Sequence, residues 1–215
     1  MHRIASFAFV IVVLLVAAAP AVAQERPVTF SVAPIVVAPL SGSGRQFDPG
    51  VGLDVAMAFN LGEQFAIVGD YVTTSLGAKN PPQYAPSAPV NADPHMQFGT
   101  ANIVFRAPVQ KVRIYVTGGV GLYHRVVTLT PTGGGSVSLC NPWWFVCYPN
   151  PVLAAQASGT RSHTDFGVNV GAGFTTGHFF AEIRYHYVWG PTFETPGGPV
   201  PATGKFLPLT IGVQF

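Results

Sequence analysis

Eight segments of the chain alternate between apolar and polar residues with a period of two. Such a pattern predicts β-strands whose two faces meet different environments. Each segment has the roughly 9–11 residues that a tilted strand needs to cross a membrane. The predicted strands are Val28–Ala38, Gly50–Phe59, Phe65–Ser75, Met96–Phe105, Val112–Val126, Thr164–Phe174, Phe179–Trp189 and Phe206–Phe215.

One face of these segments carries large apolar side chains, and the other carries small or polar ones. In Phe179–Trp189, for example, Ile183 lies on the apolar face, while Glu182, Arg184 and His186 lie on the other. A soluble barrel would turn its large apolar side chains inward, whereas a transmembrane barrel turns them toward lipid. Hydrocarbon cannot satisfy backbone groups, so a sheet within it must close on itself. We therefore predict an all-β fold, an eight-stranded antiparallel up-and-down transmembrane β-barrel.

The connections between the predicted strands support this topology. The second, fourth and sixth connections are short, and the third, fifth and seventh are long. Alternating short turns and long loops are typical of outer-membrane barrels, whose turns face the periplasm. A two-residue turn at Thr176-Gly177 would pair Phe174 with Phe179 and Asn169 with Arg184, which leaves both apolar faces on one side of the sheet.

The composition fits this fold. Charged residues make up 9% of the chain, against about 25% in ordinary soluble domains. The 24 glycines and 20 prolines disfavour helices. The formal net charge of +2 predicts no nucleic-acid partner.

The first 23 residues have the pattern of a signal peptide. His2 and Arg3 precede an apolar run that ends at Ala21-Val22-Ala23. The alternative is a permanent transmembrane helix, because the uncharged stretch is about long enough for one. We expect cleavage after Ala23, which leaves residues 24–215 as one barrel domain in a bacterial outer membrane.

Polar residues on the inward face are expected to form a network in the lumen. Buried charges are costly unless they are paired. A three-residue turn, Leu61-Gly62-Glu63, would place Asp54 opposite Asp70, and an arginine, Arg113 or Arg184, should then reach both. We expect a structural plug, with a proton or ion path as the alternative. The predicted network comprises Asp54, Asp70, Arg113, Arg125, Asp165, Asn169, Glu182, Arg184 and His186.

The longest loop contains the two cysteines of the chain, Cys140 and Cys147. In a secreted chain two cysteines predict one disulfide, here a local staple worth about 2–3 kcal/mol. Between them lies an apolar tip, Trp143, Trp144 and Phe145. The tip is either a contact surface for a partner or for lipid, or a segment that folds back onto the barrel.

No catalytic group is evident. A hydrolase needs a nucleophile, a base and an orienting acid within hydrogen-bond reach, but Ser162 and His163 are neighbours on a strand and point to opposite faces. We expect no enzyme activity, no cofactor and no metal. A lipid A-modifying enzyme remains an alternative, because some eight-stranded outer-membrane barrels act on lipid A. A soluble lipocalin-like binder would require the apolar face to point inward.

Four segments resemble the small OmpA-like outer-membrane β-barrel domain: Val112–Tyr123, Asp165–Gly173, Ala181–Tyr185 and Leu207–Phe215. The resemblance implies contact with outer-membrane lipid, and a terminal Phe215 that the outer-membrane assembly machinery reads. It does not carry over the peptidoglycan-binding function, because that domain is not in the sequence. The expected role is envelope integrity or surface contact through the outer loops, with an unspecified partner. The alternative is a narrow conduit for small or apolar solutes.

Overall fold

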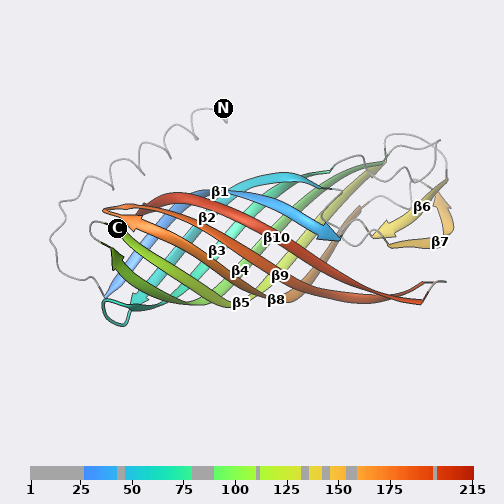
Figure 1. Ribbon diagram of the computed structural model, residues 1–215. Coiled ribbons are helices and arrows are strands. Elements are labelled where there is room, and N and C mark those ends of the chain that lie inside the picture. Colours follow the sequence, from blue (N-terminus) through green and yellow to red (C-terminus); the bar gives the residue numbers. More distant parts are fainter. Residues whose placement is uncertain are drawn as a thin grey trace, which may run out of the picture.

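The computed structural model describes residues 27–42, 47–78, 90–109, 112–131, 136–141, 146–153, 159–195 and 198–215. Within these ranges it contains ten strands, which Figure 1 labels. They are β1 (Val28–Gly42), β2 (Phe47–Asn60), β3 (Phe65–Ala78), β4 (Val90–Val109), β5 (Val112–Pro131), β6 (Ser136–Asn141), β7 (Val146–Leu153), β8 (Gly159–Thr176), β9 (Phe179–Thr195) and β10 (Gly198–Gln214).

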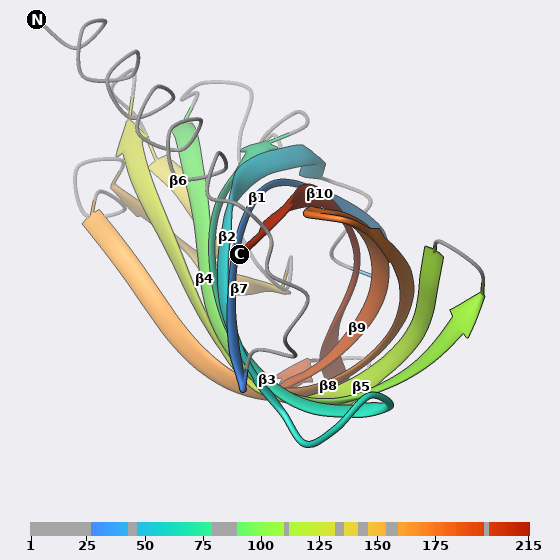
Figure 2. The same cartoon turned by 90° about the vertical axis from the view of Figure 1, so that its left-hand side faces the viewer.

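Eight of the strands form a closed antiparallel barrel, which confirms the predicted fold class. Their order around the ring is β1-β10-β9-β8-β5-β4-β3-β2, and β6 and β7 form a separate two-stranded sheet. The ring is visible along its axis in Figure 2. The first and last strands close it, and the backbones of Phe30 and Phe215 exchange hydrogen bonds of 3.0 and 2.9 Å. No helix within the described ranges is long and apolar enough to cross a membrane.

Two tight turns lie at the same end of the barrel as Phe215, and we call this the turn end (Figure 1). Gly177 begins the two-residue turn between β8 and β9, and its φ of 56° is readily adopted only by glycine. Gly62, with a φ of 129°, lies in the turn between β2 and β3. The opposite end, which carries β6 and β7, is the loop end.

Both hairpin registers differ from the predicted ones by two residues. Thr176 pairs with Phe179, so Asn169 faces His186 rather than Arg184. In the other hairpin, Asp54 faces Val72 rather than Asp70. In the β8–β9 hairpin the two-residue turn lies one residue later than predicted, at Gly177 and His178. In the β2–β3 hairpin the loop is longer than the predicted three residues, and the N–H of Leu61 donates to the carbonyl of Phe65 at 2.9 Å. A shift of two preserves the alternation of faces, so each side chain keeps its predicted side.

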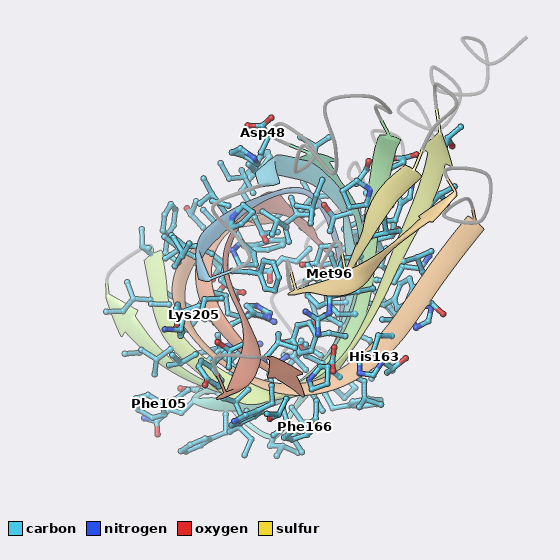
Figure 3. The ribbon with its side chains drawn as sticks, turned by 90° about the vertical axis from the view of Figure 1, so that its right-hand side faces the viewer. Asp48, Met96, Phe105, His163, Phe166 and Lys205 are labelled. Atoms are coloured by element: carbon cyan, nitrogen blue, oxygen red, sulfur yellow. The ribbon has the colours of Figure 1, made fainter. Side chains whose placement is uncertain are left out.

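The outside of the barrel carries a belt of large apolar side chains. Ile183, the residue on which the inside-out interpretation depends, is 47% exposed on the outer surface. Figure 3 shows Phe105 and Phe166 on the outside of the barrel. An exposed apolar band of this kind belongs to strands that face lipid. Other members of the belt include Phe30, Val55, Ile67, Ile103, Val116, Val120, Leu122, Val170, Phe174, Phe179, Leu209 and Ile211.

Toward the loop end, β3, β4 and β5 reverse this polarity. On β3, Ile67 and Tyr71 are exposed, but beyond them Thr73 and Ser75 face outward and Leu76 is buried inside. On β4, Met96 is buried inside. The outer half of the lumen therefore contains large apolar side chains, which were not predicted there, in addition to the predicted polar residues such as Arg125 and Asp165. Beyond the belt these strands meet water, so their apolar side chains can be buried only on the inside. The apolar layer comprises Ile35, Val37, Val72, Leu76, Met96, Phe98, Val127, Val188 and Phe206.

Candidate functional site

The centre of the lumen holds an ion-pair cluster around Arg184. From β9, its Nη1 donates to Asp70 Oδ2 on β3 at 2.6 Å, and its Nε donates to Glu182 Oε1 at 2.7 Å. Thr100 and Asn102, on β4, also donate to the Asp70 carboxylate, at 2.6 and 2.9 Å. Ionised groups buried in such a narrow interior are costly unless close opposite charges and hydrogen bonds compensate for the lost water. The cluster therefore ties three strands together across the lumen.

A layer of rings lies next to this cluster. Tyr123 and His186 share a hydrogen bond of 2.6 Å between the phenol oxygen and Nδ1, and Phe98 stacks on Tyr123 with ring centroids 5.1 Å apart. Glycines make room for these rings. A Cβ on Gly167 would lie 2.6 Å from Tyr123 Cε2, closer than real contacts allow. The inward glycines thus leave space that large side chains on neighbouring strands fill.

A second ion pair seals the lumen toward the loop end. Arg125 on β5 pairs with Asp165 on β8. Nε2 of His163, whose side chain is half exposed, lies 3.0 Å from the other oxygen of the same carboxylate. The Arg125 side chain has no exposed surface, and Tyr123 and Met96 are also fully buried. These side chains fill the cross-section of the barrel, as expected for eight strands.

Eight of the nine residues predicted for the lumen are buried there, and Arg113 is not. Arg113 lies near the turn end and is exposed, so Arg184 makes the contact with Asp70 that either arginine was expected to make. Asn169 is buried, but no hydrogen bond to its side chain is found within the described ranges. Arg113 misses the cluster because it occupies the second residue of β5, too far along the strand to reach the centre.

The cluster and the ring layer also contain three residues that the sequence did not predict for the lumen: Thr100, Asn102 and Tyr123. Thr100 and Asn102 occupy the same face of β4 as Met96 and Phe98. The signal was present, because large residues change from odd to even positions along this strand: Ile103 and Phe105 are outside, whereas Met96 and Phe98 are inside.

A small vestibule leads from the turn end to the ion-pair cluster. Its volume is about 70 Å³, and Asp54, Glu182 and Arg184 line its inner part. The side chains nearer the turn end include Arg106, whose Nη1 donates to Asn60 Oδ1 at 2.6 Å. The vestibule ends at the cluster, and the ring layer lies beyond it.

The barrel divides at the loop end into two arms. β8 pairs with β9 only as far as Gly167 and Val188. Beyond this point β8 stays with β5, whereas β9 stays with β10, and the two directions separate in Figures 1 and 3. Pro191 contributes to the division, since it has no N–H for a ladder. Among the described residues, no strand pairs with the β9-facing edge of β8 over Gly159–Phe166.

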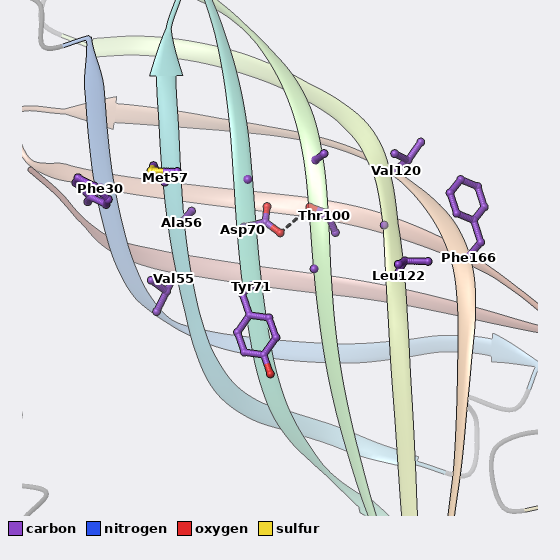
Figure 4. A pocket seen from close by; sticks show the side chains of 14 residues that line it. Phe30, Val55, Ala56, Met57, Asp70, Tyr71, Thr100, Val120, Leu122 and Phe166 are labelled. Carbon is purple, nitrogen blue, oxygen red and sulfur yellow. Dashed lines mark hydrogen bonds between the residues drawn. The ribbon is translucent and has the colours of Figure 1, made fainter.

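The belt contains a hollow, shown in Figure 4. It has a volume of about 560 Å³. Its floor consists of Gly69, Gly99 and Ala101 on β3 and β4, and its walls include Tyr71 and Phe166. A Cβ on Gly69 would meet no atom within 4 Å, so neither packing nor the backbone requires a glycine there. The hollow is open to whatever surrounds the belt.

The cysteines lie on the separate hairpin at the loop end. Cys140 of β6 is directly opposite Cys147 of β7, a register that suits the predicted disulfide, whose existence stays a prediction. Trp143, Trp144 and Phe145 lie outside the described residues, as does the expected signal peptide. Phe215 is at the turn end, paired with Phe30, and its role in assembly also stays a prediction.

The described residues contain no group of three or more His, Cys, Asp or Glu side chains that could hold a metal ion. Ser162 and His163 are both exposed, and His163 contacts Asp165 rather than Ser162. This geometry provides no nucleophile with an adjacent base.

Comparison with solved structures gives a match that is informative about the fold. The crystal structure of Neisserial surface protein A matches with a TM-score of 0.52 and 14% identity, over 88% of this chain and 96% of that chain. The chain has the fold of a small outer-membrane β-barrel. At this identity the match concerns the fold alone.

Two further matches have lower TM-scores. The N-terminal β-barrel domain of Pseudomonas aeruginosa OprF matches with a TM-score of 0.42 and 13% identity, over 89% of this chain and all of that one. The attachment invasion locus protein Ail of Yersinia pestis, in complex with a heparin analogue, matches with a TM-score of 0.41 and 13% identity, over 87% of this chain and 96% of that one. No protein-family profile and no curated sequence matches the chain.

Proposed function

We propose that the chain is a non-enzymatic integral outer-membrane barrel that makes contacts at the cell surface through the two arms at its loop end. The observation that carries this proposal is the edge of β8 over Gly159–Phe166, which pairs with no strand among the residues that the structure describes. A sheet edge offers a row of N–H and C=O groups to which an extended segment can add as a further strand. The turns face the periplasm in this orientation, and the arms face outward.

The lumen supports a contact role over the alternative of a conduit. A solute would have to pass Arg125, Tyr123, Met96 and His186, none of which has more than 1% of its surface exposed. These side chains are held by the Arg125–Asp165 pair and by the hydrogen bond between Tyr123 and His186. Recording from the protein in a planar bilayer should show no steady conductance, and a steady conductance would favour the conduit.

The contact role is tested on intact cells. Cells that produce the chain should attach to protein-coated surfaces more than cells that do not. Thr164→Pro, on the free segment of β8, should reduce this attachment, because proline removes a backbone donor and bends the edge. The matched control is Thr176→Pro, at the turn end of the same strand. Both variants must first be shown to be inserted in the outer membrane. Equal attachment by wild type and Thr164→Pro contradicts a role for this edge.

Enzyme activity is tested separately. Mass spectra of lipid A from cells with and without the chain should be identical, because the described residues contain no paired nucleophile and base. A modified lipid A species that depends on the chain would require the lipid A-modifying alternative.

A further inference from the structure

Asp54 is the carboxylate of the lumen that the ion-pair cluster does not satisfy. It lies on β2 and is 9% exposed, and none of the described residues donates a hydrogen bond to its Oδ1. Asp70, by contrast, accepts from Thr100, Asn102 and Arg184. A buried ionised carboxylate without a partner is costly. Asp54 lines the vestibule that leads in from the turn end, so a partner can reach it from that side.

The charges around the vestibule do not balance. Asp54, Asp70 and Glu182 lie near one central guanidinium, that of Arg184. Arg106 contributes a second positive charge, but toward the mouth, where it donates to Asn60. With all these groups ionised, the site has one more negative than positive charge, and the excess is at Asp54. The field of the vestibule therefore favours a cation.

The remaining lining supplies oxygen ligands. Nearer the turn end than Asp54, hydroxyl groups come from Thr29 and Ser31 on β1, and an amide comes from Gln214 on β10, which is paired with Ser31. Of the two hydroxyls, that of Thr29 already accepts from Asn60 Nδ2 at 3.0 Å, and that of Ser31 is closer in register to Asp54. Carboxylate, hydroxyl and amide oxygens suit hard cations, whereas soft metals prefer sulfur and imidazole. A volume of about 70 Å³ has room for one small ion with a few waters.

We propose that the vestibule binds a single small monovalent cation, Na⁺ or K⁺, against the Asp54 carboxylate. A divalent ion is disfavoured, because the described residues offer no group of three acidic or other metal-binding side chains at one point. The cation supplies the positive charge that the cluster around Arg184 lacks, and it stabilises the folded barrel without crossing it. This inference is independent of the surface contacts proposed above.

The first test is thermal unfolding of the full folded protein in detergent at constant ionic strength. Replacing N-methyl-D-glucamine chloride, whose cation is too large for the vestibule, by NaCl or KCl should raise the midpoint of wild type by about 2–4 °C and then saturate. Asp54→Asn should lose this dependence. Glu63→Gln, which removes an exposed carboxylate at the same end, should keep it. The same dependence in Asp54→Asn as in wild type, or none in wild type, overturns the proposal.

The second test needs no variant, and so it does not depend on Asp54→Asn folding. Crystals of the wild-type protein grown in RbCl should give an anomalous rubidium peak beside Asp54 Oδ1. A map without this peak at saturating RbCl means that Asp54 is neutralised by a proton or solvated by water alone, and it overturns the proposal.

Discussion

Arg184 Nη1 lies 2.6 Å from Asp70 Oδ2, and this contact joins β9 to β3 across the lumen between residues 114 positions apart in sequence. Neither strand is a neighbour of the other in the ring. The pair therefore links opposite walls of the barrel through side chains alone, in addition to the ladder of backbone hydrogen bonds around it.

Removing this arginine should destabilise the barrel strongly. Arg184→Ala leaves Asp70 and Glu182 buried without their cation. We expect this to lower the free energy of unfolding by about 3–5 kcal/mol, as is typical when one partner of a buried ion pair is removed. Urea-induced unfolding in lipid vesicles measures the loss. Arg113→Ala is the matched control, because Arg113 is exposed and should change stability by no more than about 0.5 kcal/mol. Equal unfolding midpoints for the two variants would contradict the assigned role of the cluster.

The two kinds of glycine should respond differently to an added methyl group. In Gly167→Ala the new Cβ would lie 2.6 Å from Tyr123 Cε2 and 2.7 Å from the carbonyl oxygen of Tyr187, which should cost about 1–3 kcal/mol. In Gly69→Ala it would enter open space, and stability should be unchanged or slightly higher. The same unfolding assay decides between them. A loss in Gly69→Ala as large as that in Gly167→Ala would show that the hollow, too, is a packed contact.

A charged side chain introduced in the belt should destabilise the barrel, whereas one introduced on the surface beyond the belt should not. Val170 is 60% exposed within the belt, so Val170→Arg should cost about 2–4 kcal/mol if it lies near the middle of the bilayer. Ser75 is exposed beyond the belt, on β3, and Ser75→Arg should be nearly neutral. Folded yield in vesicles and the urea midpoint report both effects. Equal tolerance of arginine at both positions would mean that the belt does not face hydrocarbon.

The cysteines should form a disulfide that stabilises only their own hairpin. Thiol titration of the unfolded, unreduced protein should detect no free thiol. The double variant Cys140→Ser with Cys147→Ser should keep the barrel's unfolding midpoint, because β6 and β7 pair with no barrel strand among the described residues. Two titratable thiols in the protein isolated from the envelope would rule out the disulfide.

The sequence was sufficient for the fold class because the alternation of faces survives small errors in register. The predicted pairing of Asn169 with Arg184 was off by two residues, and both side chains still point into the lumen. The error came from the position of the turn: Gly177 is the first turn residue, not the second. Local sequence could not decide this, since both alternatives keep every apolar side chain outside.

The outer parts of the strands were harder to predict. The segments Val90–His95 and Gly190–Pro201 contain five of the chain's prolines and few alternating apolar residues, so the sequence predicts loops there. The structure has strands over Val90–His95, Gly190–Thr195 and Gly198–Pro201. Pairing with a neighbouring strand outweighs weak local propensity there. Likewise, the contact between Arg184 and Asp70 depends on the curvature of the closed ring, which no single hairpin specifies.

The most direct test of the inside-out barrel is the surroundings of Ile183. In a Cys140→Ser and Cys147→Ser background, a spin label attached through Ile183→Cys in vesicles should collide readily with oxygen, which concentrates in hydrocarbon, and rarely with a water-soluble nickel complex. A label at Ser75→Cys should show the opposite preference. If the label at position 183 is shielded from both reagents or prefers nickel, the apolar face is not toward lipid, and the account is contradicted.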